Sequence, residues 1–433
     1  MRRTRDHWAV ILLALCATAF SPALSSENSG ANASQVEEPG AVTEPGAVTE
    51  PGAVTEPGAA TEPGAATEPG VTAERILFGQ SAAFSGPARE LGRNMNLGIE
   101  AAFQEANRRG GVHGRQLELI TLDDAYEPEA AIANTRKLIE EEEVFALIGA
   151  VGTPTSRSAV PITSEAGVPY IAPFTGAIFL RDNTDTGVIN LRASYFQETE
   201  EIVDRLSRDL GITRIGVMYQ NDSFGRVGYR GVRRALERRQ LDPVAIGVYP
   251  RNTTAIKAGL LDLQQGKPDA VVVIGAYQPV ATLIAWARHV GFNPVFATIS
   301  FVGSNALAGE LGPDGRGVLV SQVVPFPAAG NIAIAVQYRR ALSAHAPGTT
   351  PGFVSFEGYL AGKLTITALE GCGPDVRRSC LMESLNRAGT IDLGGLRLEF
   401  GEGDNQGSDA VFLTVIGQDG RYHPIRTLRD VMP

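Results

Sequence analysis

The chain has 433 residues, of which 43% are hydrophobic and 20% are charged, and this is enough for two folded lobes with their own cores. Its formal net charge is −10 and no basic cluster stands out. Binding to nucleic acid, which needs such a cluster, is therefore not expected.

The first 25 residues read as an export signal. Arg2, Arg3 and Arg5 form a positive start, and an apolar run follows from Trp8 to Phe20. This run is short for a membrane span and typical of a signal peptide. Cys16 leaves three fates open: cleavage near residue 25, lipidation, or retention as an anchor.

Residues 26–73 form a linker built on a six-residue repeat, Glu-Pro-Gly-Ala-Val/Ala-Thr. Residues 31–73 contain seven glutamates and neither lysine nor arginine. Proline removes backbone donors, glycine adds conformational freedom and the glutamates repel one another, so this segment cannot bury a core. We expect a disordered spacer.

A regular alternation of strands and helices begins after residue 74. Its first series has expected strands at 75–79, 117–120, 145–149 and 168–171, and expected helices at 91–106, 129–142 and 154–166. This order predicts a parallel sheet covered by helices on both faces.

The alternation then starts again. Expected helices lie at 198–210, 225–238, 255–265 and 279–291, with strands at 214–219, 244–249, 270–275, 295–297 and 318–321. Two such series predict an α/β protein of two doubly wound lobes. Ligands of open α/β sheets bind beyond the carboxyl ends of the strands, so a cleft between the lobes is the expected site.

Cysteine and histidine patterns favour a structural role over catalysis or metal binding. Cys372 and Cys380 are eight residues apart, and in an oxidising compartment they are expected to form a local disulfide; a zinc site is the weaker alternative. The five histidines show no metal-ligand spacing. We expect no metal, no cofactor and no catalytic residue.

Several short motifs, in their order and spacing, resemble the leucine/isoleucine/valine-binding proteins of bacterial ABC importers. They are Ser85-Gly86-Pro87, the segment 101–114 with its Gly110-Gly111-Val112-His113-Gly114 end, Asp123-Asp124, the loop 149–155, and Phe224-Gly225. The resemblance covers about residues 74–425. It implies a type I periplasmic-binding-protein fold, in which the chain crosses three times between lobes that close on the ligand like a hinge.

The resemblance also implies domain boundaries. The first lobe is expected at 74–192 and the second at 193–323. The chain then returns to the first lobe at 324–395, and to the second lobe and a tail at 396–433. The crossings are expected near Arg192, Val324 and Leu396.

In the first lobe, the resemblance places a carboxylate-binding loop at Gly152 and Thr153, where a helix N-terminus favours an anion. The alternative is that Thr153 only caps the helix. Thr175 matches a second hydroxyl donor. Phe174 either lines the pocket or packs in the core.

In the second lobe, Phe224 and Tyr277 match aromatic positions that cover the ligand, although Tyr277 could instead be an ordinary half-buried tyrosine. Ser85, Tyr195 and Phe301 complete the expected set of ligand-site residues.

Two departures from the family pattern concern the ligand. The glutamate that holds the ligand's ammonium group aligns with Ser300, and a buried ammonium without a counter-charge costs several kcal/mol. Asp222 and Glu357 are candidate substitutes, with a surface or supporting role as the alternative for Glu357. Leu91 replaces an aromatic wall of the side-chain pocket. We therefore expect that leucine, isoleucine and valine do not bind tightly.

The sequence as a whole predicts a periplasmic solute-binding protein, free or tethered through its N-terminal segment, that hands a small polar or amino-acid-like ligand to an ABC permease. We expect a monomer. The alternative is a ligand-sensing subunit that signals through a membrane receptor, and an enzyme is a more distant third.

Overall fold

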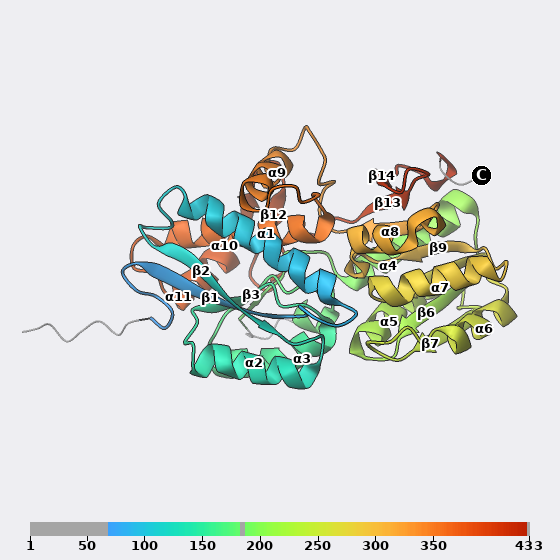
Figure 1. Cartoon of the computed structure of the whole chain (residues 1–433), viewed down its shortest axis with the longest axis horizontal. Coiled ribbons are helices and arrows are strands. Elements are labelled where there is room, and N and C mark those ends of the chain that lie inside the picture. The colour runs from blue at the N-terminus through green and yellow to red at the C-terminus, as the bar shows by residue number, and fades with distance from the viewer. Residues whose placement is uncertain (1–67, 182–186, 431–433) are drawn as a thin grey trace, which may run out of the picture. The chain divides into compact units, whose positions relative to one another are not determined.

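The computed structural model describes residues 68–181 and 187–430. The expected signal sequence at 1–25 and nearly all of the repeat linker at 26–73 lie outside the described residues. Between Glu74 and Asp430, strands and helices alternate almost throughout, and the strands form two separate main sheets (Figure 1).

The first lobe is built on a five-stranded parallel sheet in the order β2-β1-β3-β4-β5. Its elements up to the first crossing are β1 (Arg75–Ala82), α1 (Arg89–Asn107), β2 (Gln116–Asp123), α2 (Pro128–Glu140), β3 (Ala146–Ile148), α3 (Thr153–Glu165), β4 (Tyr170–Ile171) and β5 (Val188–Ile189). Helices α2 and α3 pack together on one face, and α1 packs on the other with α10 (Phe353–Cys372) (Figure 1).

The second lobe holds a seven-stranded sheet in the order β14-β13-β10-β9-β8-β6-β7. Its elements up to the second crossing are α4 (Tyr195–Leu210), β6 (Ile215–Gln220), α5 (Ser223–Glu237), β7 (Ala245–Tyr249), α6 (Lys257–Gly266), β8 (Ala270–Ile274), α7 (Tyr277–His289), β9 (Val295–Thr298), α8 (Ser304–Leu311) and β10 (Leu319–Gln322). The parallel strands β6 to β10 are flanked by the antiparallel pair β13 (Phe412–Ile416) and β14 (Tyr422–Pro424).

After β10 the chain returns to the first lobe and then leaves it again. The return supplies α9 (Ala333–His345), α10, α11 (Arg378–Arg387), β11 (Thr390–Asp392) and β12 (Arg397–Glu399). Leu396 lies in the hairpin between β11 and β12, and the next strand of the seven-stranded sheet begins at Phe412. The third crossing follows that hairpin, and Gln406 within it pairs with Asn190 of the first crossing.

Glycines allow the closest helix contact of the first lobe. A Cβ on Gly98 of α1 would lie 1.9 Å from the carbonyl oxygen of Ser355, and one on Gly358 of α10 would lie 2.2 Å from that of Met95. Both distances are shorter than any real Cβ contact, so only glycine lets α1 and α10 approach this far. A disulfide joins Cys372, the last residue of α10, to Cys380 in the first turn of α11.

Candidate functional site

The N-terminus of α3 faces a second hydroxyl in the first lobe. Gly152 precedes the helix with φ 109°, and a Cβ there would lie 2.2 Å from a ring carbon of Tyr126. Thr153 opens the helix without capping it: its Oγ1 lies 2.7 Å from Oγ1 of Thr175 instead. Both threonines are fully buried. The two predicted hydroxyl donors therefore form one pair beside a helix N-terminus that has no side-chain cap.

Phe301 of the second lobe packs among aromatic rings from both lobes. Its ring centroid lies 4.4 Å from that of Phe224 and 5.5 Å from that of Phe174, with Tyr126 and Tyr195 slightly farther, at 6.0 and 6.4 Å. All five side chains are buried. Phe174 thus belongs both to the core and to the face that the first lobe turns toward the second.

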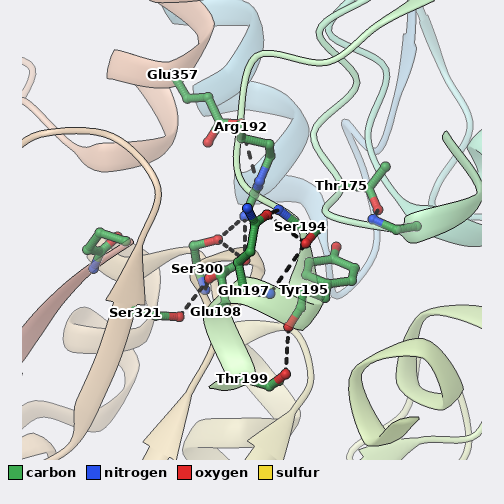
Figure 2. Close-up of polar contacts among 12 residues, drawn as sticks. Thr175, Arg192, Ser194, Tyr195, Gln197, Glu198, Thr199, Ser300, Ser321 and Glu357 are labelled. Atoms are coloured by element: carbon green, nitrogen blue, oxygen red, sulfur yellow. Dashed lines mark hydrogen bonds and ion pairs between the residues drawn. The ribbon is translucent and has the colours of Figure 1, made fainter. Parts of the chain in front are cut away.

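Arg192, in the first crossing between β5 and α4, lies between carboxylates from both lobes. Its Nη2 donates to Oε1 of Glu198 on α4 at 3.0 Å, and its Nη1 lies 3.5 Å from Oε1 of Glu357 on α10. Figure 2 shows Arg192 with Glu357 on one side and with Glu198 and Ser300 on the other. The arginine side chain is completely buried. Burial lowers the pKa of Arg192, but Glu357 and Glu198 outweigh it and keep that pKa above its usual range.

Glu198 is fully engaged by donors. Besides Arg192, it accepts hydrogen bonds from the backbone N–H of Ser300 at 2.8 Å, from Ser300 Oγ at 3.0 Å and from Ser321 Oγ at 2.6 Å. Ser300 Oγ also contacts Arg192. A carboxylate therefore does lie beside Ser300, but it comes from α4 and is already paired.

Glu357 has fewer partners than Glu198. Its one ion pair is the 3.5 Å contact to Arg192, and no hydrogen bond to its carboxylate is found among the described residues. Burial raises the pKa of Glu357 to about 7 against the opposing effect of Arg192. Near neutral pH its carboxyl group is therefore partly protonated.

The two lobes also touch at a second place, around Leu91. A Cβ on Gly303 would lie 2.4 Å from a methyl carbon of Leu91, which shows how closely the N-terminal end of α1 approaches the turn before α8. Tyr277 lies beside this contact, at the start of α7. The lobes also meet at the N-terminus of α2, where Glu127 of the first lobe pairs with Arg251 of the second and accepts a hydrogen bond from Asn252 at 2.6 Å.

Asp222 and Ser85 serve local structure. Asp222 caps α5 by accepting the backbone N–H of Gly225 at 3.0 Å, and it also accepts Gln220 Nε2 at 2.6 Å. Burial raises its pKa. Ser85 is exposed, and its backbone N–H donates to Asp123. Within the described residues, neither side chain is seen to contact the Arg192 group, by which we mean Arg192, Glu198, Ser300, Ser321 and Glu357.

Several buried polar atoms on these facing surfaces lack a hydrogen-bond partner among the described residues. They are Nε and Nη1 of Arg192 and the hydroxyls of Tyr126, Tyr195, Tyr249 and Tyr277. Buried polar groups are paired in roughly nine cases out of ten. Arg192 and these tyrosines therefore have unused hydrogen-bonding capacity where the lobes meet.

The sequence predicted no ligand-binding role for Arg192, Glu198 or Tyr126. Arg192 was expected only as a crossing point. A local signal existed for none of the three, because each gains its place through contacts with distant segments. Most of the expected ligand-site residues lie together near Arg192 and Phe301: Thr153, Phe174, Thr175, Tyr195, Phe224, Ser300 and Glu357. Gly152 adjoins this set, and Leu91 and Tyr277 lie at the second contact between the lobes.

Three other features of the described residues do not contribute to this candidate site. Within residues 68–181 and 187–430, no cluster of histidine, cysteine or carboxylate side chains has the makings of a metal site. In the same ranges, no helix combines the length and hydrophobicity needed to cross a bilayer. A groove that includes Asn305, Phe326, Phe353 and Tyr422 contains none of the expected ligand-site residues.

The chain is similar to known proteins in both sequence and structure. A model of the periplasmic binding protein family matches residues 76–421. The "Leu/Ile/Val-binding protein homolog 7" of Brucella abortus (strain 2308) is 29% identical over 230 residues, which are 51% of this chain and 57% of that relative. The match thus spans little more than half of the relative's length.

Solved structures match over more of the chain. The possible leucine/isoleucine/valine-binding protein of Rhodopirellula baltica SH 1 has a TM-score of 0.79 and 39% identity, covering 85% of this chain and 100% of that one. A substrate-binding periplasmic protein of Ralstonia solanacearum has a TM-score of 0.76 and 28% identity, covering 81% and 100%. The predicted fold class, two doubly wound lobes joined by three crossings, is confirmed, and so is the resemblance on which it partly rested.

Proposed function

Because the chain belongs to the periplasmic binding protein family, we propose that it binds a small solute between its two lobes and delivers it to an ABC permease. The observation that carries the proposal is the group of unpartnered polar atoms on Arg192 and the buried tyrosines, beside the Thr153–Thr175 pair. These atoms come from both lobes, as expected of a protein that closes on its ligand.

The proposed solute is small and polar or amino-acid-like, and it is bound without being changed. The names of the Brucella and Rhodopirellula relatives point to branched-chain amino acids. The surroundings of Ser300 argue against them, because Glu198 already accepts four hydrogen bonds there and is neutralised by Arg192. We propose that leucine, isoleucine and valine bind weakly.

The proposed location is the periplasm, where the family works, and the proposed partner is a permease in the inner membrane. A monomer suits this role, because the solute site needs only the two lobes of one chain. Hinge closure would then be the step that presents the loaded form to the permease.

The test is to purify the exported protein, denature it and identify released small molecules by mass spectrometry. We expect one solute in near-stoichiometric amount, and its return to the stripped protein should restore binding in calorimetry. A Thr153→Val variant should retain much less of it, whereas Thr282→Val, on the outer part of α7, should retain as much as the unmodified protein. If no solute is recovered and none binds, the proposal is wrong. Loaded protein that stimulates a membrane kinase but no permease ATPase would favour the sensing role.

A further inference from the structure

We propose that the solute is a small carboxylic acid without an ammonium group, held by the Thr153–Thr175 end of the site and by the free donors of Arg192. This inference rests on the proposed function and names the class of solute.

The first step concerns the donors of Arg192. Nη2 donates to Glu198 and to Ser300, and Nη1 faces Glu357 at 3.5 Å without a hydrogen bond. Nε is buried without any partner among the described residues. A guanidinium can only donate, so whatever completes its bonding must be an acceptor. Nε and Nη1 point in different directions, so a solute carboxylate would meet the guanidinium through one of these donors, in a charge-assisted hydrogen bond.

The second step concerns the acceptors that an ammonium would need. Glu198 is occupied by four donors. Asp222 accepts two, from Gly225 and Gln220, and the bond to Gly225 caps α5. Glu357 has more spare capacity, but it lies 3.5 Å from Nη1 of Arg192. An ammonium that reached Glu357 would lie beside a buried guanidinium, and that like-charge contact is unfavourable.

The third step is the charge balance. Two cations, Arg192 and the part-buried Arg181, share this region with Glu198 and Glu357, and Arg181 Nη2 donates to the carbonyl of Arg192 at 2.8 Å. Burial and the nearby Arg192 lower the pKa of Arg181 to about 9. When Glu357 is protonated, one positive charge is left without a carboxylate. A bound anion compensates that charge, and a bound cation adds to it.

The fourth step concerns the rest of the solute. The guanidinium carbon of Arg192 lies 4.9 Å from the ring centroid of Phe174, and that ring stacks on Phe301. Thr175 follows Phe174 directly in the chain, so the hydroxyl pair and the arginine border the same aromatic wall. Figure 2 shows Tyr195 on the same side of Arg192 as Thr175. A solute held by the hydroxyl pair and the arginine would therefore lie against this wall.

The test uses matched pairs that differ only at the α-carbon: leucine with α-ketoisocaproate, and phenylalanine with phenylpyruvate. Each is titrated into the stripped, unmodified protein by calorimetry. In each pair of which a member binds, we expect the keto acid to bind at least about tenfold more tightly than its amino acid, because a ketone accepts where an ammonium donates. An amino acid that binds as tightly as its keto acid, or more tightly, overturns the inference.

If none of the four compounds binds, the chemical class of the solute recovered from the purified protein tests the inference. A recovered acid without an amine supports the inference, and a recovered amine or neutral compound overturns it. If no solute of any kind is recovered or bound, the proposed function itself fails, and the inference fails with it.

Arg192→Lys supplies an independent readout on the same titration. The lysine keeps the charge beside Glu198 but loses the second donor direction, so affinity for the acid should fall at least about tenfold. Arg205→Lys is the matched control, because Arg205 pairs with Glu201 and Asp209 on α4, away from the aromatic wall, and should leave affinity unchanged. Equal affinities in the two variants would contradict the role given to Arg192.

Discussion

Removing the charge of Glu198 should destabilise the protein more than any comparable change on α4. The side chain is fully buried and its carboxylate accepts four hydrogen bonds, from Arg192, twice from Ser300 and from Ser321. Glu198→Gln keeps the size and one acceptor oxygen but leaves Arg192 with Glu357 alone, at 3.5 Å. Breaking a buried ion pair in this way costs about 3–5 kcal/mol.

Glu201→Gln is the matched control. Glu201 lies on the same helix and pairs with Arg205, but about a third of its side chain is exposed. Pairs in such positions contribute about 0.2–1 kcal/mol. Equilibrium urea unfolding followed by circular dichroism should therefore separate the two variants by more than 2 kcal/mol. If Glu198→Gln lowers the free energy of unfolding no more than Glu201→Gln does, Arg192 does not depend on a buried counter-charge. The stabilising role given to the Arg192–Glu198 pair is then wrong.

Three further predictions concern the ligand, the disulfide and pH. Thr153→Val should weaken binding of the recovered solute about tenfold in calorimetry, through loss of one hydrogen bond to a charged group. It should also lower the free energy of unfolding by about 1 kcal/mol, because the bond to the buried Thr175 is lost; unchanged affinity would remove Thr153 from the site. Cys372→Ser combined with Cys380→Ser should lower the free energy of unfolding by about 2–3 kcal/mol, because the bond closes a short loop; equal urea midpoints would refute this. The raised pKa of Glu357 means that the folded state holds its proton more tightly than the unfolded state does. Its contribution to stability is therefore present below pH 4.5 and falls, by on the order of 3 kcal/mol, as the pH rises to about 7. Glu357→Gln should flatten urea-derived stability over that window, and an unchanged slope would contradict the assignment. Asp124, whose pKa burial also raises to about 7, keeps part of the slope in both proteins.

The fold was predictable because its signals are local. The strand β8 is five consecutive buried residues, Ala270–Ile274, and its apolar run is visible in the sequence without any partner. Differences between the expected and the observed helices and strands lie at their ends. The helix expected from residue 198 begins at Tyr195, because Ser194 and Gln197 form a capping box that extends it by almost one turn. That box could have been recognised from the sequence.

The Arg192 group was much less accessible to sequence reasoning. Arg192 and Glu198 are six residues apart, but Ser300, Ser321 and Glu357 reach them from three other segments of the chain. No periodicity relates such positions, and an arginine near a lobe boundary is ordinarily a surface residue. Its burial follows from the way two lobes meet, which only the three-dimensional arrangement contains. Thr153 and Thr175 were easier to identify, because the family resemblance assigns each a place in the loop after its own strand.

The second contact between the lobes, around Leu91, was also only partly predictable from the sequence. Leu91 could be placed on a helix from its spacing, whereas nothing in the sequence pointed to Gly303, the residue before α8, as its partner. That the two pack against each other, with room for glycine alone, depends on how the lobes approach. Sequence patterns therefore described each lobe well and the space between the lobes poorly.

The central claim is that one solute contacts both lobes at the place where Arg192 lies. Hydrogen–deuterium exchange, measured by mass spectrometry on stripped protein with and without its recovered solute, tests this directly. The account predicts slower exchange of the backbone amides at 152–156 in the first lobe and at 300–303 in the second, together with those around Arg192. Protection confined to one lobe, or to the groove around Phe326 and Tyr422, would contradict it.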